Sequence, residues 1–214
     1  MATPAHSKII NNVAREVLKP IGVKRKGQSR VWFDDNGWWI FVIEFQPSSW
    51  SKGTYLNVGV NWLWHPKEYF SFDLGYREES FIEYKSDAQF EPRARDLAIA
   101  AKAKVLEMRN NLANLEAAKT YTIGAYCEEP ETIWNQFHQG MLCALAGSLD
   151  DANAYFMKVL ESPDERDWAI ELKQSVNDVL NMVSNAKDFK SYVCNIVNEA
   201  RKIKKLEDWH CEFA

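Results

Sequence analysis

Residues 38–64 read WWIFVIEFQPSSWSKGTYLNVGVNWLW, two aromatic and β-branched runs that flank a polar loop. In the second run apolar and polar side chains alternate, which is the period of a half-buried strand. Its apolar face is expected to carry Leu56, Val58, Val60, Trp62 and Trp64. The loop Pro47–Thr54 is rich in the residues that turns prefer. The stretch therefore predicts two antiparallel strands, Trp38–Gln46 and Tyr55–Trp64, with one face turned to a core.

Shorter runs of the same composition extend this pair on both sides. They predict strands at Arg30–Asp34, Glu68–Leu74 and near Ser80–Tyr84. Asp35-Asn36-Gly37 marks a tight hairpin turn, because Asn and Gly tolerate the positive φ that such turns require. The expected sheet is an antiparallel meander of four or five strands.

Two helical patterns accompany the strands. Apolar residues at helical spacing predict a first helix over residues 8–18, with Ser7 as its cap. Pro92 stands where a proline opens a helix, and a long helix is predicted over residues 92–119. Its apolar stripe is expected to cover one face of the sheet. Residues 1–126 are therefore expected to form an α+β domain, a meander packed by an N-terminal helix and one long helix.

Residues 127–214 have the composition of an all-helical C-terminal region. Before them, Thr120–Tyr126 fits a short strand or an extended linker, and Pro130 is expected to open the helices, which run to about Leu206. The acidic run Glu128–Glu131 fits a helix start, where the helix dipole favours negative charge.

Within this region Ile133–Asp164 resembles a single tetratricopeptide repeat. Small residues at Gly140 and Ala152 suit the close packing of two helices, with a turn at Gly147–Asp150. One isolated unit of this kind implies a packing solution rather than a peptide-binding groove, because stacked neighbours are needed to form the concave surface.

Charge and cysteine usage bound the partners and the compartment. The formal net charge is −4, which argues against a nucleic-acid partner, since nucleic-acid binders normally carry a basic surface. The start MATPAHSKII lacks the pattern of a signal peptide, and no apolar run approaches the roughly 20 residues that span a bilayer, so no membrane partner is expected. Cys127, Cys143, Cys194 and Cys211 lack metal-ligand spacing and are expected to be four reduced thiols of a cytoplasmic protein.

The sequence contains none of the common catalytic motifs. The chain has no nucleophile elbow, phosphate-binding loop, dinucleotide fingerprint or zinc-protease motif, and its histidines lack ligand spacing. We therefore assign no catalytic residue, no metal and no cofactor.

Two stretches are candidates for binding. The first is the basic turn Gly22–Gly27, in which Lys24 and Arg25 would hold a phosphate or an acidic partner surface. The alternative is a solvated loop whose cations favour the C-terminal end of the preceding helix.

The second candidate is the face of the sheet that the helix leaves open, with the adjoining loop. Its residues are Trp38, Glu44, Gln46, Ser49, Trp50, Lys52, Tyr55, Asn57 and Asn61. Aromatic and amide side chains together are typical of recognition surfaces. Gly59 lies between the asparagines and indicates close approach by another backbone or a ligand. The alternative is that Trp50 folds back on the sheet and the serines only solvate the turn.

At these residues the sequence resembles the bacterial family "domain of unknown function 4304", over about residues 5–120. The matching residues are Gly22, Lys24, Arg25, Gly27, Trp39, Phe45, Gln46, Ser48, Ser49, Ser51, Gly53, Asn57, Gly59 and Val60. The resemblance implies the same architecture and no particular activity.

Three functions remain open. The first is a non-catalytic protein-binding module, of the kind that neutralises a toxin as immunity proteins do. The second is an enzyme or binding protein for a phosphorylated small molecule or nucleotide, with Glu44 as the general base. This second function needs the basic turn and the Ser48–Gly53 loop to converge on one site. The third is a homo-oligomer that forms through the helical C-terminal region.

Overall fold

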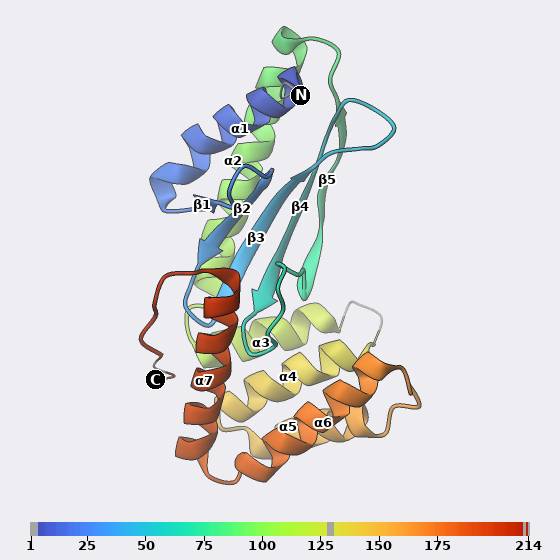
Figure 1. Cartoon of the computed structure of the whole chain (residues 1–214), viewed down its shortest axis with the longest axis vertical. Coiled ribbons are helices and arrows are strands. Elements are labelled where there is room, and N and C mark those ends of the chain that lie inside the picture. The colour runs from blue at the N-terminus through green and yellow to red at the C-terminus, as the bar shows by residue number, and fades with distance from the viewer. Residues whose placement is uncertain (1–3, 128–130, 212, 214) are drawn as a thin grey trace. The chain divides into compact units, whose positions relative to one another are not determined.

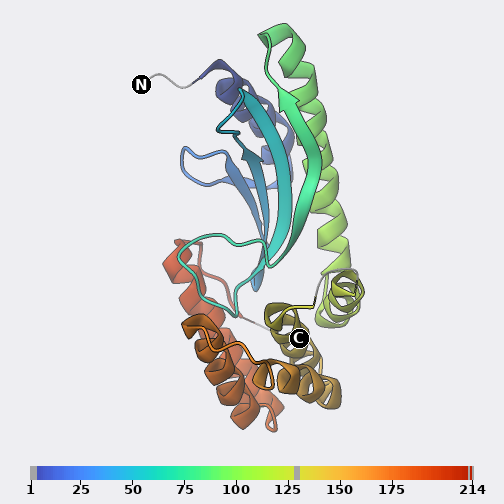
Figure 2. The same cartoon turned by 90° about the vertical axis from the view of Figure 1, so that its right-hand side faces the viewer.

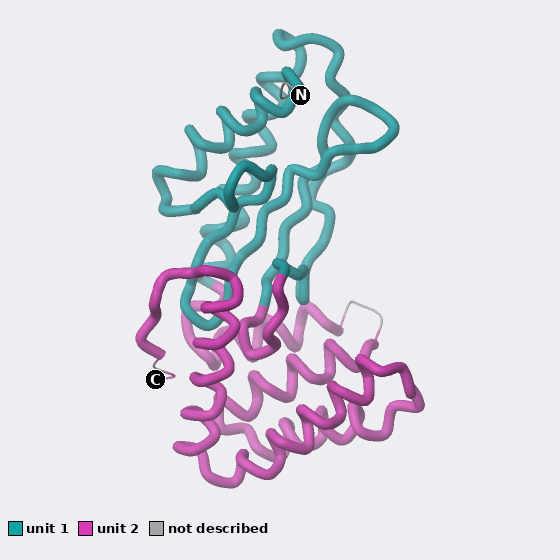
Figure 3. The backbone as a smooth tube through the Cα atoms, in the orientation of Figure 1, with its two compact units in different colours: residues 1–61, 69–110 teal, residues 62–68, 111–214 magenta. Residues whose placement is uncertain are grey.

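The computed structural model describes residues 4–127, 131–211 and 213. The chain divides into two compact units, which are made of residues 1–61 with 69–110 and of residues 62–68 with 111–214 (Figure 3). The expected boundary between residues 126 and 127 falls inside the second unit. Residues 128–130, where Pro130 was expected to open the helical region and where the acidic run begins, lie outside the described residues.

The first unit is built on a five-stranded antiparallel sheet whose strands follow one another in chain order (Figure 1). The strands are β1 (Lys24–Arg25), β2 (Val31–Asp35), β3 (Trp39–Gln46), β4 (Gly53–Trp62) and β5 (Leu74–Glu83). The register places Trp32 opposite Ile43, and Val58 opposite Tyr76. The predicted antiparallel meander is confirmed.

The strand expected near Ser80–Tyr84 is found as the second half of the longer β5, whereas the strand expected over Glu68–Leu74 is wrong, because these residues form a loop up to the last of them. The aromatic residues of this loop serve packing instead, since the Phe70 ring lies 5.2 Å from the Phe33 ring. The remaining strand comes from Lys24–Arg25, which the sequence indicated only as a turn.

Helices α1 (Ala5–Leu18) and α2 (Asp87–Asn111) cover one face of the sheet (Figure 2). The two helices lie side by side, and a hydrogen bond of 2.7 Å from Arg95 Nη2 on α2 to Glu16 Oε2 on α1 joins them. The core side of α2 includes Leu97, Ala101, Val105 and Met108. The α+β fold with an N-terminal helix and a long helix is thus confirmed.

The starts of both helices differ from expectation. Ser7 lies inside α1, and Pro4 is the N-cap residue. Pro92 lies inside α2, which begins at Asp87, an acidic residue that the helix dipole favours there. A proline so near the start removes only one intrahelical hydrogen bond, which makes its position tolerable.

The long helix predicted over residues 92–119 is in fact two helices, α2 and α3 (Leu115–Tyr126). Asn114 starts the second one, because its side chain accepts a hydrogen bond from the Ala117 backbone N–H at 2.9 Å. Thr120–Tyr126, expected as a strand or linker, belongs to this helix. The apolar stripe continues across the break, so the periodicity alone did not show it.

The second unit confirms the predicted all-helical region. After α3 it contains α4 (Ile133–Leu145), α5 (Leu149–Leu160), α6 (Asp167–Met182) and α7 (Ala186–Lys204). Helices α4 and α5 form a hairpin through Gly147, whose φ of +84° is left-handed. A Cβ atom at Gly140 would lie 2.5 Å from the Phe156 ring, so the glycine is what lets α5 approach α4.

Trp62 and Trp64, at the end of β4 and just beyond it, have neighbours that their alternation did not indicate. Their rings stack at a centroid distance of 4.8 Å. Trp64 Nε1–H donates to Nδ1 of His138 on α4 at 3.1 Å, and both residues are buried. Both tryptophans therefore belong to the helical unit, instead of the core under the long helix in which we expected them.

The expectation of four reduced thiols is wrong, because Cys194 and Cys211 form a disulfide. Helix α7 ends at Lys204, and its C-cap residue Lys205 is left-handed, with a φ of 57°, and reverses the chain. Ten helical residues rise about 15 Å, and the six residues that follow Lys205 can span that distance back. The pairing depends on this reversal, which the spacing of the cysteines did not reveal. Cys127 and Cys143 are free thiols.

Candidate functional site

The open face of the sheet carries a connected set of polar side chains. Asn57 Nδ2 donates to Glu44 Oε2 at 3.1 Å and to Gln46 Oε1 at 3.0 Å. Arg77 on β5 joins them, donating to Asn57 Oδ1 and to Gln46 Oε1, and its guanidinium lies 3.9 Å from the centre of the Tyr55 ring. Four predicted residues, Glu44, Gln46, Tyr55 and Asn57, are therefore brought together. Arg77 was missed because the loop before β5 was taken as a strand.

Two residues predicted for this face are not exposed. Asn61 is fully buried, and its Nδ2 donates to Ser71 Oγ at 2.9 Å and to Asp73 Oδ2 at 3.0 Å. Trp38 is buried beside Trp39, with their rings 6.3 Å apart. The loop that precedes β5 supplies both of these partners of Asn61, which is why alternation alone misplaced that residue.

Gly59 is also explained within the chain. A Cβ atom there would lie 2.8 Å from Gly75 Cα and 2.9 Å from the Phe72 ring. The close approach that the glycine indicated is therefore made by β5 and its preceding loop, and it needs no ligand.

The loop between β3 and β4 presents Trp50, which is 94 % exposed. Ser48 Oγ holds the turn by accepting from the backbone N–H groups of Trp50 at 3.1 Å and Ser51 at 3.4 Å. Ser49 and Lys52 are exposed beside it. The alternative that Trp50 folds back on the sheet is wrong.

A cavity of about 550 Å³ lies in the first unit where α1 ends and the sheet begins. Its lining residues are Arg15, Lys19, Gly22, Val23, Lys24, Arg25, Gly27 and Trp32. Lys24 and Arg25 come from the predicted basic turn. Arg15 and Lys19 were not predicted as site residues. They are one helical turn apart, and a short 3-10 turn connects them to β1, so their closeness in sequence to Lys24 and Arg25 was an available signal. We call these eight residues the basic cavity.

A second cavity of about 300 Å³ continues along α1 from the basic cavity. It is lined by Lys8, Asn11, Asn12, Arg15, Arg25 and Gln28, so Arg15 and Arg25 border both spaces. None of the residues that line either cavity is acidic.

Hydrogen bonds to backbone carbonyls hold the Arg25 guanidinium in place. Arg25 Nε donates to the Ser29 carbonyl at 2.7 Å, and its Nη2 donates to the Gln28 carbonyl at 2.6 Å. Burial lowers the pKa of the Arg25 guanidinium, and the charge of Arg15 lowers it further. The two guanidinium groups therefore lie close enough to repel each other.

The floor of the basic cavity is Trp32, which is only 2 % exposed. Its indole Nε1–H is buried without a hydrogen-bond partner among the described residues. Asn11, at the border of the second cavity, likewise has a buried Oδ1 without a partner. Polar groups of this kind normally pair, and a buried water molecule is their ordinary partner where the chain supplies none.

The predicted convergence of the basic turn with the loop before β4 is only partial. Arg30 Nη2, in the turn that follows β1, donates to the Gly53 carbonyl at 3.2 Å. Glu44 and Lys52, however, do not line the basic cavity. In the register, Glu44 lies opposite Val31, and therefore on the other face of the sheet from Trp32.

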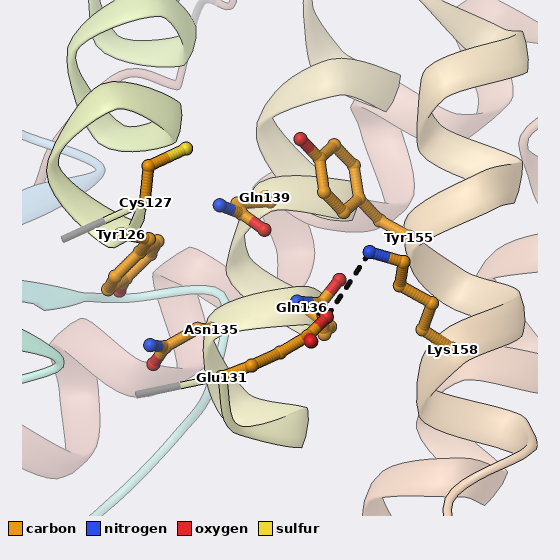
Figure 4. Close-up of a pocket in the computed structure, with 8 residues that line it drawn as sticks. All are labelled: Tyr126, Cys127, Glu131, Asn135, Gln136, Gln139, Tyr155 and Lys158. Atoms are coloured by element: carbon orange, nitrogen blue, oxygen red, sulfur yellow. Dashed lines mark hydrogen bonds and ion pairs between the residues drawn. The ribbon is translucent and has the colours of Figure 1, made fainter. Parts of the chain in front are cut away.

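The helical unit contains a smaller cavity, of about 240 Å³, between α3, α4 and α5 (Figure 4). It is lined by Tyr126, Cys127, Glu131, Asn135, Gln136, Gln139, Tyr155 and Lys158. Glu131 Oε1 accepts from Gln136 Nε2 at 2.7 Å and from Lys158 Nζ at 3.2 Å. We call these eight residues the amide cavity.

Comparisons with known protein families, curated proteins and solved structures find no match. The resemblance to the family of unknown function therefore stays a prediction. No cluster of three or more His, Cys, Asp or Glu side chains in the described ranges is placed to hold a metal ion. Within the same ranges, none of the helices combines the length and the apolar character that a bilayer crossing requires.

Proposed function

We propose that the protein binds a small phosphorylated ligand in the basic cavity. The observation that carries this proposal is the lining itself, in which Arg15, Lys19 and Arg25 surround the Trp32 floor and no lining residue is acidic. Like charges held together raise the free energy of the empty site, and a phosphate relieves that repulsion while accepting their hydrogen bonds.

The proposal is for binding rather than catalysis. Glu44, the one general base that the sequence suggested, lies on the other face of the sheet and is already hydrogen-bonded to Asn57. Arg25 is held in place by backbone carbonyls, which lowers the entropy that it loses on binding a ligand. The Trp32 ring, only 2 % exposed, closes the floor beneath the bound phosphate.

Calorimetric titration with inorganic phosphate, pyrophosphate and nucleoside monophosphates tests this function. We expect at least one of them to bind the wild type, and Arg15→Gln/Lys19→Gln to weaken its Kd at least about tenfold, because each charged hydrogen bond contributes about 1.5–3 kcal/mol. Arg93→Gln/Lys102→Gln removes the same charge from α2, away from the cavity, and should leave the Kd unchanged within about twofold.

Two results would contradict the proposal. One is that no phosphate compound binds at millimolar concentration. The other is that both double variants weaken binding equally, since this would reveal general attraction to positive charge rather than a site.

As a second function, we propose that the loop with Trp50 binds a protein partner. The supporting observation is that a tryptophan exposed over 94 % of its surface stands on a turn whose backbone N–H groups are hydrogen-bonded to Ser48 Oγ. Tryptophan is the residue most enriched in the energetic centres of protein interfaces, and a fixed loop loses little entropy on binding.

Cross-linking followed by affinity purification from the native host tests this second function. Wild type should enrich a partner that Trp50→Ala loses, while Tyr69→Ala, which removes another exposed aromatic side chain of the same unit, should retain it. The proposal fails when Trp50→Ala retrieves the same proteins as the wild type.

The finer expectations stay predictions. A toxin-neutralising role and a homo-oligomer formed through the helical region are both of this kind. The cytoplasmic location is also a prediction. The Cys194–Cys211 disulfide argues against it, because disulfides are rare in reducing compartments.

A further inference from the structure

The amide cavity of the helical unit contains two buried carbonyl oxygens that have no hydrogen-bond partner among the described residues. Gln136 is 6 % exposed and Gln139 is 4 % exposed, and both side chains line the cavity. For the Oε1 atom of each, the described residues provide no hydrogen-bond donor. Both residues belong to α4, three positions apart, so they share one face of that helix (Figure 4).

Leaving such oxygens unpaired is costly. A buried acceptor that has lost its partner costs about 1–3 kcal/mol, and two of them occur in one small space. A folded chain gains by replacing them with apolar groups unless a donor arrives from outside. The cavity therefore needs hydrogen-bond donors that the described side chains do not supply.

The charged residues of the lining favour a neutral hydrogen-bond donor over a charged one. Glu131 and Lys158 are the only formally charged residues among the eight, and they form an ion pair at 3.2 Å. Among the described lining residues, a charged ligand would have to compete with this ion pair for an opposite charge, and burying it unpaired would be unfavourable. Tyr126 and Tyr155 add aromatic surface beside the amides.

We infer that the amide cavity binds a small neutral molecule rich in hydroxyl or amide N–H donors. Its donors would pair with Oε1 of Gln136 and Oε1 of Gln139, and its apolar edges would contact the rings of Tyr126 and Tyr155. The site is independent of the basic cavity, which is built from residues of the other unit.

Cys127 offers a direct reporter, because its thiol is exposed and lines the cavity. Cys143 is an internal control. It is buried, and burial raises the pKa of its thiol to about 11, so it reacts slowly. Alkylation by iodoacetamide under non-reducing conditions therefore measures access to Cys127, since the other two cysteines are joined in the disulfide.

The experiment follows the rate of Cys127 alkylation with increasing glucose, myo-inositol, N-methylurea or, as a charged arm, methylammonium. We expect at least one neutral compound to slow alkylation several-fold with a saturating concentration dependence, and methylammonium to have no effect. The hydroxyl and amide arms then tell which donor the site prefers.

Substitution of the acceptors decides whether the cavity causes the protection. Gln139→Leu should abolish it and leave the melting temperature equal or higher, because an unpartnered oxygen is removed. Gln174→Leu, the same change on the exposed side of α6, should retain protection. Three results would overturn the inference: no neutral compound slows alkylation, Gln139→Leu keeps the protection, or methylammonium protects as well as the neutral compounds do.

Discussion

Arg109→Met is expected to lower the free energy of unfolding by about 3–5 kcal/mol, the largest effect of any single change considered for this protein. Asp34 is 2 % exposed, and Arg109 supplies both of the donors that neutralise it, with Nε–Oδ2 at 2.9 Å and Nη2–Oδ1 at 2.5 Å. Arg109 Nη2 also donates to the Ile21 carbonyl at 2.7 Å. Removal of the arginine leaves a buried carboxylate whose remaining side-chain partner is Asn36. Urea unfolding, followed by circular dichroism, measures the loss.

A double variant separates the ion pair from simple loss of contact. Asp34→Leu/Arg109→Met removes both charges and should recover most of the stability, because apolar replacements avoid the uncompensated charge. Arg93→Met, an exposed arginine on the same helix, should change the free energy of unfolding by less than about 0.5 kcal/mol. A loss below about 1 kcal/mol for Arg109→Met would show that Asp34 has other sufficient partners.

Removal of the disulfide is expected to have the second largest effect. Cys194 and Cys211 are 17 residues apart, and closing a loop of that length stabilises the folded state by about 3 kcal/mol. The Cys194→Ser/Cys211→Ser variant should therefore unfold at lower urea concentration by that free energy. The tail that follows α7 should also become sensitive to protease, although Lys190 Nζ still donates to the Phe213 carbonyl at 2.9 Å.

The wild type carries its own control. A reducing agent should destabilise the wild type by about as much as the double substitution does, and it should have no effect on the Cys194→Ser/Cys211→Ser variant. Peptide mapping without reduction should yield one linked pair that contains Cys194 and Cys211. Recovery of all four cysteines as free thiols from the untreated protein would contradict the disulfide.

Local patterns predicted those parts of the fold that local physics decides. The alternation in residues 38–64 gave the strands Trp39–Gln46 and Gly53–Trp62 to within about two residues at each end. The helix break at Asn114 was visible as a capping residue, but the apolar stripe that continues past it outweighed that signal. Aromatic residues before β5 predicted a strand, whereas the chain uses Phe70 to cover Phe33.

In the candidate sites, too, the sequence predicted the residues that are neighbours in the chain and missed those that only the fold brings together. Lys24 and Arg25 were predicted because they are adjacent in sequence, and the cavity includes them. Arg15 and Trp32 complete it from other elements, and only the fold brings them to the same place. The amide cavity gave no sequence signal at all, because glutamine is common on helix surfaces and its burial becomes visible only when α3, α4 and α5 are packed.

The indole N–H signal of Trp32 reports directly on whether a phosphorylated ligand occupies the basic cavity. The nine tryptophans give nine indole signals in an ¹H–¹⁵N spectrum, and Trp32→Phe identifies the one that belongs to the cavity floor. On titration with pyrophosphate at constant ionic strength, we expect the Trp32 signal to shift along a saturation curve, while the signal of the exposed Trp50 stays in place. A Trp32 signal that does not move, or that moves only in step with all the others, would contradict it.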